Sequence, residues 1–116
     1  MACEQDCPSE IDQRVNQIIE QIEFASQPEG AAWSFRLLSS SNTIDSLVQK
    51  ISNERNTPIN SDPISRIKYM ADSLLEGHEE SQELWWYDYS DKSYIEHGFV
   101  VTENCKVQER LHIGSN

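Results

Sequence analysis

The sequence predicts an α+β fold in which three helices pack on one face of an antiparallel sheet, in the order α-β-α-α-β-β-β. Three segments repeat apolar residues at the spacing of an amphipathic helix. A segment before residue 40 alternates with a period of two, and the last third of the chain is rich in strand formers. Helices and strands that are segregated along a chain in this way are typical of the α+β class.

The first helix is expected from about Ser9 to Ala25. Ser9 can accept a hydrogen bond from a free amide at the helix start, and Gln27-Pro28-Glu29-Gly30 would end the helix. Residues 1–8 are expected to be a flexible lead-in, so that residues 9–116 form a single domain. The apolar stripe of this helix comprises Ile11, Val15, Ile18, Ile19 and Ile22.

The middle of the chain predicts a short strand and two further helices. Trp33, Phe35 and Leu37 alternate with their neighbours, which indicates a half-buried strand. Asn42 or Thr43 can cap the second helix, and Asp62-Pro63 is a strong start for the third. The buried faces of these helices are expected to be Ile44, Leu47, Val48 and Ile51, and then Ile64, Ile67, Met70, Ala71, Leu74 and Leu75.

The last third predicts a meander of three strands. The strands are expected at Leu84–Tyr89, Tyr94–Val101 and Val107–Ile113. Polar turns separate them, and Gly98 is a candidate position for a bulge. Short turns of this kind join antiparallel neighbours, so the three strands should pair in sequence order.

The charge of the chain excludes some partners and favours others. Among 116 residues, 20 are acidic and 9 are basic, so the formal net charge is 9 − 20 = −11. Nucleic-acid phosphates and anionic membranes attract basic surfaces, so neither is an expected partner. A basic protein is favoured instead. No apolar stretch approaches the ~20 residues of a membrane span, and the first residues lack the features of a signal peptide, so we expect the cytoplasm.

The negative charge is concentrated beside a cluster of aromatic residues. The stretch from Tyr69 to Asp91 contains no Lys or Arg. Exposed aromatic residues surrounded by charge are typical anchors of protein interfaces. The alternative is a solvated acidic loop beside an ordinary aromatic strand. The candidate partner-binding residues are Glu76, Glu79, Glu80, Glu83, Trp85, Tyr87, Asp88, Tyr89 and Asp91. A second acidic patch, at residues 4–29, is better explained by helix capping and a polar helix face.

The sequence indicates no cofactor, metal site or catalytic group. Cys3, Cys7 and Cys105 do not have the spacing of a zinc site, and we expect them to be free thiols. His97 and His112 could work with a nearby carboxylate as acid and base, but a surface histidine is the simpler interpretation. We therefore expect no enzyme activity.

These observations favour a small acidic module that neutralises or occludes a basic partner protein. The most concrete version is an immunity protein or antitoxin for a nuclease-type toxin, because nuclease active sites are positively charged. The alternative is a ligand-binding or enzymatic domain with a pocket between helices and sheet, formed by Trp33, Trp86, Tyr94 and His97. A structural or regulatory adaptor is a third possibility.

Overall fold

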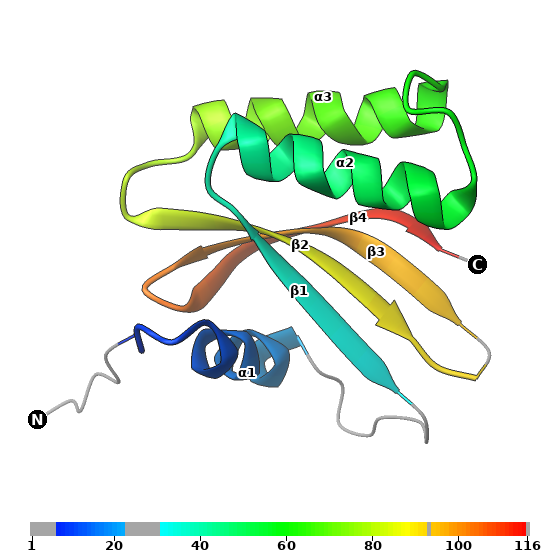
Figure 1. The fold of residues 1–116 in the computed structure, drawn as a ribbon. Coiled ribbons are helices and arrows are strands. Elements are labelled where there is room, and N and C mark those ends of the chain that lie inside the picture. Colours follow the sequence, from blue (N-terminus) through cyan, green and yellow to red (C-terminus); the bar gives the residue numbers. More distant parts are fainter. Residues whose placement is uncertain (1–6, 23–30, 93, 116) are drawn as a thin grey trace, which may run out of the picture.

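The computed structural model describes residues 7–22, 31–92 and 94–115, and it confirms the predicted class and element order (Figure 1). The helices are α1 (Ile11–Ile22), α2 (Ser41–Arg55) and α3 (Asp62–Gly77). The strands are β1 (Ala32–Leu38), β2 (Gln82–Ser90), β3 (Ile95–Glu103) and β4 (Lys106–Ser115). They form one antiparallel sheet in the order β1-β2-β3-β4, so β1 adds a fourth strand to the predicted meander.

The helix starts follow local capping chemistry. α2 begins earlier than predicted, because Ser40 is its N-cap and forms a capping box with Thr43. The Ser40 amide donates to Thr43 Oγ1 at 2.9 Å, and the Thr43 amide donates to Ser40 Oγ at 3.3 Å. α3 has a proline in its first turn, as the sequence predicts, but its N-cap is Ser61, so Asp62 is the first helical residue and not the predicted capping residue. The predicted end of the first helix, at residues 23–25, lies outside the described residues.

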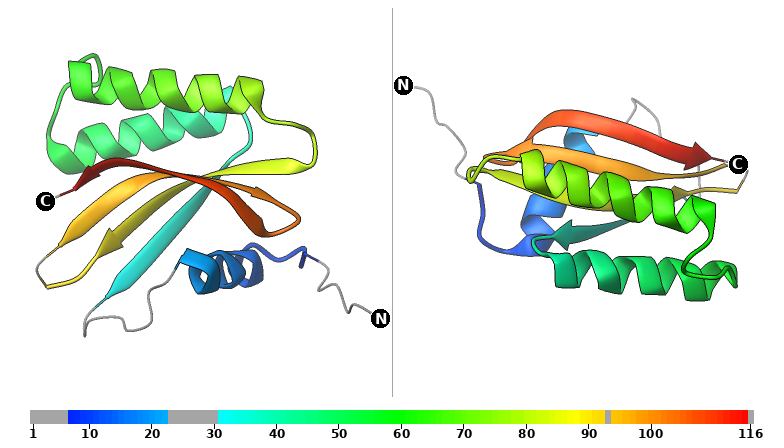
Figure 2. Two further views of the ribbon diagram at one scale, coloured as in Figure 1. Left: turned by 180° about the vertical axis from the view of Figure 1, so that it is seen from behind. Right: turned by 90° about the horizontal axis from the view of Figure 1, so that it is seen from above.

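Helices cover both faces of the sheet, which corrects the expectation that all three share one face (Figures 1 and 2). α2 and α3 pack over Leu84, Trp86 and Phe99, whereas α1 packs over Trp85 and Tyr87. The cause lies in β2, where four successive large side chains are each at most 2% exposed. Successive side chains point to opposite faces of a sheet, so a strand of this kind needs cover on both.

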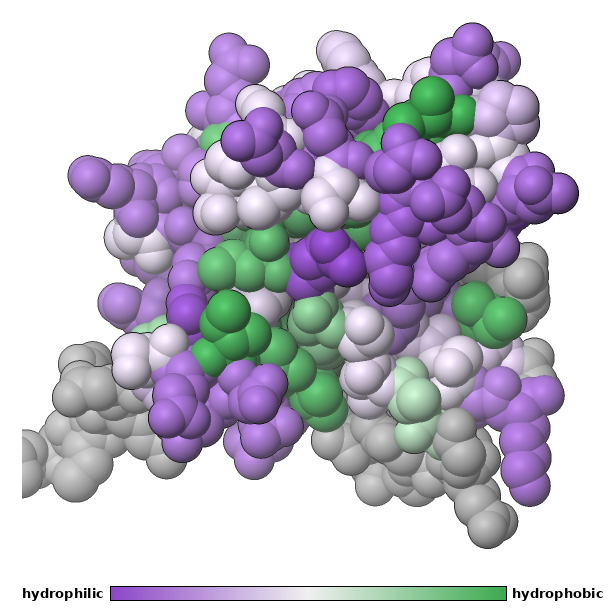
Figure 3. Space-filling view, viewed as in Figure 1, coloured by the Kyte–Doolittle hydropathy of each residue, from purple (hydrophilic) through white to green (hydrophobic). Residues whose placement is uncertain are grey.

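The outer sides of α2 and α3 are mostly hydrophilic in the space-filling view (Figure 3). Their inner sides are apolar and bury Ile44, Leu47 and Ile51 of α2 and Ile64 and Ile67 of α3. This is the amphipathic pattern that the sequence predicts for both helices, except that Met70, predicted on the buried face of α3, is 37% exposed. Among the described residues, no helix has the length and apolar character needed to cross a membrane.

A disulfide between Cys7 and Cys105 joins the segment before α1 to the β3–β4 turn. This pairing corrects the expectation of free thiols for these two residues; Cys3 lies outside the described part of the chain. Cys105 is only 3% exposed, and it follows Asn104 in a turn where both residues have a positive φ. That backbone conformation is unfavourable for a residue with a Cβ, and tight hairpin turns place Gly there more often.

Gln21 makes a second link between α1 and the same turn. Its side-chain oxygen accepts a hydrogen bond from the Val107 amide at 2.7 Å, and its nitrogen donates to the Cys105 carbonyl at 2.5 Å. Ile18 and Ile22 of the same helix are buried against the sheet. The disulfide, the Gln21 contacts and this apolar face together fix the position of α1.

Opening the disulfide is expected to lower the free energy of unfolding by about 2–4 kcal/mol, because a link between residues 98 apart restricts the unfolded chain. The comparison is between Cys3→Ser and Cys3→Ser/Cys7→Ser, since the first substitution also prevents rescue by another thiol. Urea unfolding followed by tryptophan fluorescence measures the difference. Equal stability of the two variants would contradict a stabilising cross-link.

Candidate functional site

Three connections lie together at one end of the molecule: the α3–β2 loop, the β3–β4 turn and the segment before α1 (Figures 1 and 2). They unite acidic residues that are far apart in the sequence. We call this surface the acidic end and define it by Glu10, Glu76, Glu79, Glu80, Glu83 and Glu103. Together with Arg14 of α1 and Lys106 of β4, these six residues carry a formal charge of 2 − 6 = −4.

Arg14 is the residue that joins the two acidic segments. Its guanidinium forms an ion pair with Glu83, which is 69 residues away in the sequence, and donates to the Ser9 carbonyl at 3.2 Å. The guanidinium also lies over the Trp85 ring, 5.8 Å from its centroid. Arg14 therefore neutralises Glu83, and in the described part of the chain no Lys or Arg forms an ion pair with Glu76, Glu79 or Glu80.

The α3–β2 loop presents its acidic side chains from an ordered backbone. The Glu79 amide donates to Gln82 Oε1 at 2.8 Å, and the Gln82 amide donates to the Glu79 carbonyl at 2.9 Å. Glu76, Glu79 and Glu80 are all exposed. Four of the predicted partner-binding residues, these three and Glu83, thus lie at the acidic end.

The aromatic part of the predicted site lies elsewhere. Trp85 and Tyr87 are 0% exposed beneath α1, so neither can contact a partner in this fold. Asp88 faces α2, and the Tyr89 hydroxyl donates to Asp91 Oδ2 at 2.7 Å near the far end of β2. Since β2 has nine residues and rises about 3.3 Å per residue, its two ends are roughly 26 Å apart. The structure does not bring these residues to the acidic end.

A polar cluster around Glu96 lies on the same face of the sheet as α1. Glu96 accepts hydrogen bonds from the hydroxyls of Tyr87 and Tyr94, the latter at 2.8 Å, and forms an ion pair with Arg110. Gly98 lies opposite Tyr87, and a Cβ at this position would be 2.0 Å from a β4 carbonyl oxygen. The absence of a side chain there gives the Tyr87 ring room to reach across β3.

The ionisation of the Glu96 cluster does not suit acid–base catalysis. Burial alone would raise the pKa of Glu96, but hydrogen bonds from Tyr87, Tyr94 and Arg110 hold it below its usual value. Burial, assisted by the bond to Glu96, raises the pKa of Tyr87 to about 12. A catalytic acid or base works best with a pKa near the working pH. Both groups are displaced away from neutrality, so neither is suited to proton transfer near neutral pH.

His97 lies on the opposite face, between a tryptophan and an arginine. Its ring stacks on Trp86 with centroids 5.6 Å apart, and Arg55 Nη2 lies 2.9 Å from its Nε2. Burial lowers the pKa of His97, and the positive charge of Arg55 lowers it further. Because Arg55 can only donate, the contact favours a neutral ring in which the unprotonated nitrogen is the acceptor.

The predicted pocket residues are divided between the two faces. Trp33 packs with the cluster beneath α1, and Tyr94 bonds to Glu96 on that face. Trp86 and His97 lie on the face of α2 and α3. The four residues therefore do not form one pocket, although Trp86 does contribute to a different one.

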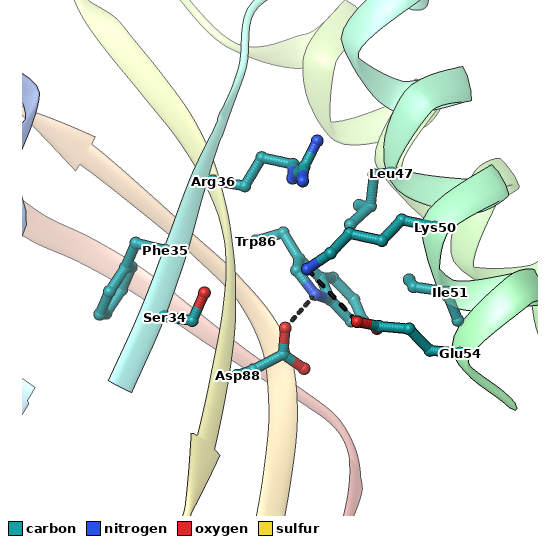
Figure 4. Close-up of a pocket in the computed structure, with 9 residues that line it drawn as sticks. All are labelled: Ser34, Phe35, Arg36, Leu47, Lys50, Ile51, Glu54, Trp86 and Asp88. Atoms are coloured by element: carbon teal, nitrogen blue, oxygen red, sulfur yellow. Dashed lines mark hydrogen bonds and ion pairs between the residues drawn. The ribbon is translucent and has the colours of Figure 1, made fainter. Parts of the chain in front are cut away.

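That pocket lies between α2 and the adjoining strands β1 and β2, and has a volume of about 230 Å³ (Figure 4). It is lined by Ser34, Phe35, Arg36, Leu47, Lys50, Ile51, Glu54, Trp86 and Asp88. Sequence analysis missed Arg36. The available signal was its position in β1, because the alternation that puts Trp33 and Phe35 on one face puts Arg36 on the face of α2.

Within the described ranges, no group of three His, Cys, Asp or Glu side chains could hold a metal ion. Comparison of the chain with protein-family models, with curated proteins and with solved structures finds no match. The functional interpretation therefore depends on the surfaces and pocket described above.

The pKa of His97 is expected to lie below 6.5, and NMR titration of its ring protons measures it. Arg55→Gln removes the adjacent positive charge and should raise this pKa, whereas Arg66→Gln on the exposed side of α3 should not. A folded-state pKa below that of the unfolded chain means that the unfolded chain takes up the proton first. Stability should therefore fall as the pH falls below 6.5. An unchanged His97 pKa in Arg55→Gln would contradict the role of Arg55.

Proposed function

We propose that the protein binds a basic protein partner through its acidic end, most concretely as an immunity protein or antitoxin that occludes a nuclease-type toxin. The supporting observation is the meeting of two acidic segments at one end, with Arg14 and Lys106 as their cations. The partner contributes the missing positive charge. Ile11, 48% exposed at the start of α1, adds apolar surface beside the carboxylates.

Electrostatics favours association at this surface. The exposed carboxylates of Glu76, Glu79 and Glu80 repel one another in the free protein, and a basic partner relieves that repulsion. Complementary charge also steers the partner during diffusion and accelerates encounter, an effect that falls with ionic strength. The proposed interaction should therefore weaken as salt is added.

A nuclease-type partner fits this chemistry because nucleases hold phosphates with clustered Lys and Arg. An acidic protein that occupies such a cluster competes directly with nucleic acid. The assignment to toxin inhibition rests on this complementarity alone.

Charge reversal at the acidic end is expected to abolish capture of the partner. Glu79→Lys/Glu80→Lys is compared with wild type in pull-downs from the producing cells, with captured proteins identified by mass spectrometry. Asp62→Lys is the matched control, because it reverses an exposed charge at the other end of α3, about 24 Å away. Circular dichroism confirms that each variant is folded.

Capture that is equal in the reversed variant and in wild type would contradict the proposed site. A captured protein without excess basic charge would contradict the proposed partner. For the toxin version, the captured protein should cleave nucleic acid, and stoichiometric addition of the acidic protein should stop the cleavage.

The compartment in which the protein acts is open to a separate test. The sequence favours the cytoplasm, but a structural disulfide such as Cys7–Cys105 is typical of oxidising compartments. We expect intact cells that are alkylated before lysis to yield Cys7 and Cys105 in one disulfide-linked peptide pair. Recovery of both cysteines as alkylated thiols would mean that the disulfide is not formed in the cell, and would favour the cytoplasm as the compartment.

A further inference from the structure

We infer that the pocket between α2 and the strands β1 and β2 binds a small zwitterion, of the class of free aliphatic α-amino acids. This site is separate from the acidic end and does not depend on the proposed partner. Arg36 and Asp88 extend into it from the strands, and Lys50 and Glu54 extend toward them from α2 (Figure 4). Positive and negative side chains therefore face the same small volume.

Arg36 supplies the positive side. It is half-buried, and it makes no ion pair or hydrogen bond with any of the residues that the structure describes. Arg14 and Arg110, which are also half-buried, each have a carboxylate partner. A guanidinium is always charged and presents a planar set of donors that matches a carboxylate. The free donors of Arg36 thus define a position for the carboxylate of a ligand.

Asp88 supplies the negative side in a fixed orientation. Its Oδ2 accepts a hydrogen bond from the Trp86 indole at 3.0 Å, and Trp86 is itself buried. No described residue donates to Oδ1, which stays available for a ligand ammonium group. Arg36 pairs with Trp86 across the sheet, so Arg36 and Asp88 are diagonal neighbours with backbones roughly 7–8 Å apart. A molecule whose ammonium and carboxylate groups are bonded to the same carbon can contact both side chains.

The remaining lining selects for a ligand without net charge. Lys50 and Glu54 pair with each other at 3.6 Å, and the formal charge of the four ionic side chains is 2 − 2 = 0. A simple anion pairs with Arg36 but is repelled by Asp88, whereas a simple cation pairs with Asp88 but is repelled by Arg36. A zwitterion satisfies both sides at once.

The volume and the apolar part of the lining set the size of the ligand. About 230 Å³ corresponds to roughly eight water molecules at about 30 Å³ each, and hence to a ligand of about eight or nine non-hydrogen atoms. Valine and leucine have this size. Leu47 and Ile51 of α2 line the inner wall of the pocket, but they are only 2% and 5% exposed, so the apolar contact that they add is small and the charged side chains carry most of the recognition.

The test is an NMR titration of the full chain that follows the indole N–H of Trp86, which bonds directly to Asp88. L-leucine is the probe, with 4-methylpentanoate and 3-methylbutylamine as analogues that lack the ammonium or the carboxylate. We expect a saturable shift with leucine at millimolar concentration. Each analogue should bind at least about tenfold more weakly, because each leaves one charged side chain unsatisfied.

Two substitutions locate the site on opposite walls of the pocket. Arg36→Gln and Asp88→Asn should each abolish the leucine response, and Asp88→Asn keeps an oxygen that can accept from Trp86. Arg66→Gln, on the exposed side of α3, should bind leucine like wild type, and so should Glu79→Lys/Glu80→Lys. No saturable shift with leucine, or equal affinity for either analogue, would overturn the proposal. So would unchanged binding in a folded Asp88→Asn variant.

Discussion

In β2, the large side chains of Leu84, Trp85, Trp86 and Tyr87 follow one another directly, and each is almost completely removed from water. Alternate members point to opposite faces, so the sheet needs apolar cover on both of them. α2 and α3 form an antiparallel pair long enough to cover one face. α1 has only 12 residues, which is marginal for a helix in isolation. Its place on the other face therefore depends on its buried isoleucines and on the disulfide at Cys7.

The sequence predicts the helices and strands well, but it predicts poorly which face of the sheet each helix covers. The reason is that helices and strands depend on neighbouring residues, whereas their packing depends on residues far apart in the sequence. Helix starts and apolar stripes are local, so the start of α3 to within one residue and most of its buried face, although not Met70, could be predicted from neighbouring residues. The face that α1 covers depends on contacts between residues 80 or more apart, such as Gln21 with Cys105. One local signal was present: an uninterrupted apolar run such as Leu84–Tyr87 indicates burial on both faces, whereas strict alternation leaves one aromatic set exposed.

The same distinction applies to the candidate sites. The stretch without Lys or Arg predicts the negative charge at Glu79 and Glu80, because composition alone defines it. Glu10 joins that surface only through the fold, which pairs Arg14 with Glu83. The pairing of Cys7 with Cys105 could not be deduced from three cysteines, and the spacing of Cys3 and Cys7 gave no indication of it. The alternation of β1 indicates which face Arg36 occupies. It does not indicate that Arg36 is half-buried without an ion-pair partner, because the sequence around such an arginine does not differ from that around an exposed one.

The net charge of −11 acts differently on the ligands of the two proposed sites. At the acidic end it attracts a basic protein over a distance, and the attraction is screened within about 8–10 Å by salt. The pocket is set back along β2, where the five residue steps from Glu83 to Asp88 span about 16 Å. Screening over that distance lets each site bind its ligand without strong influence from the other. The overall negative field repels simple anions that Arg36 alone would attract, but it exerts no net force on a zwitterion. The acidity that favours a basic partner at one end thus also favours an uncharged ligand in the pocket.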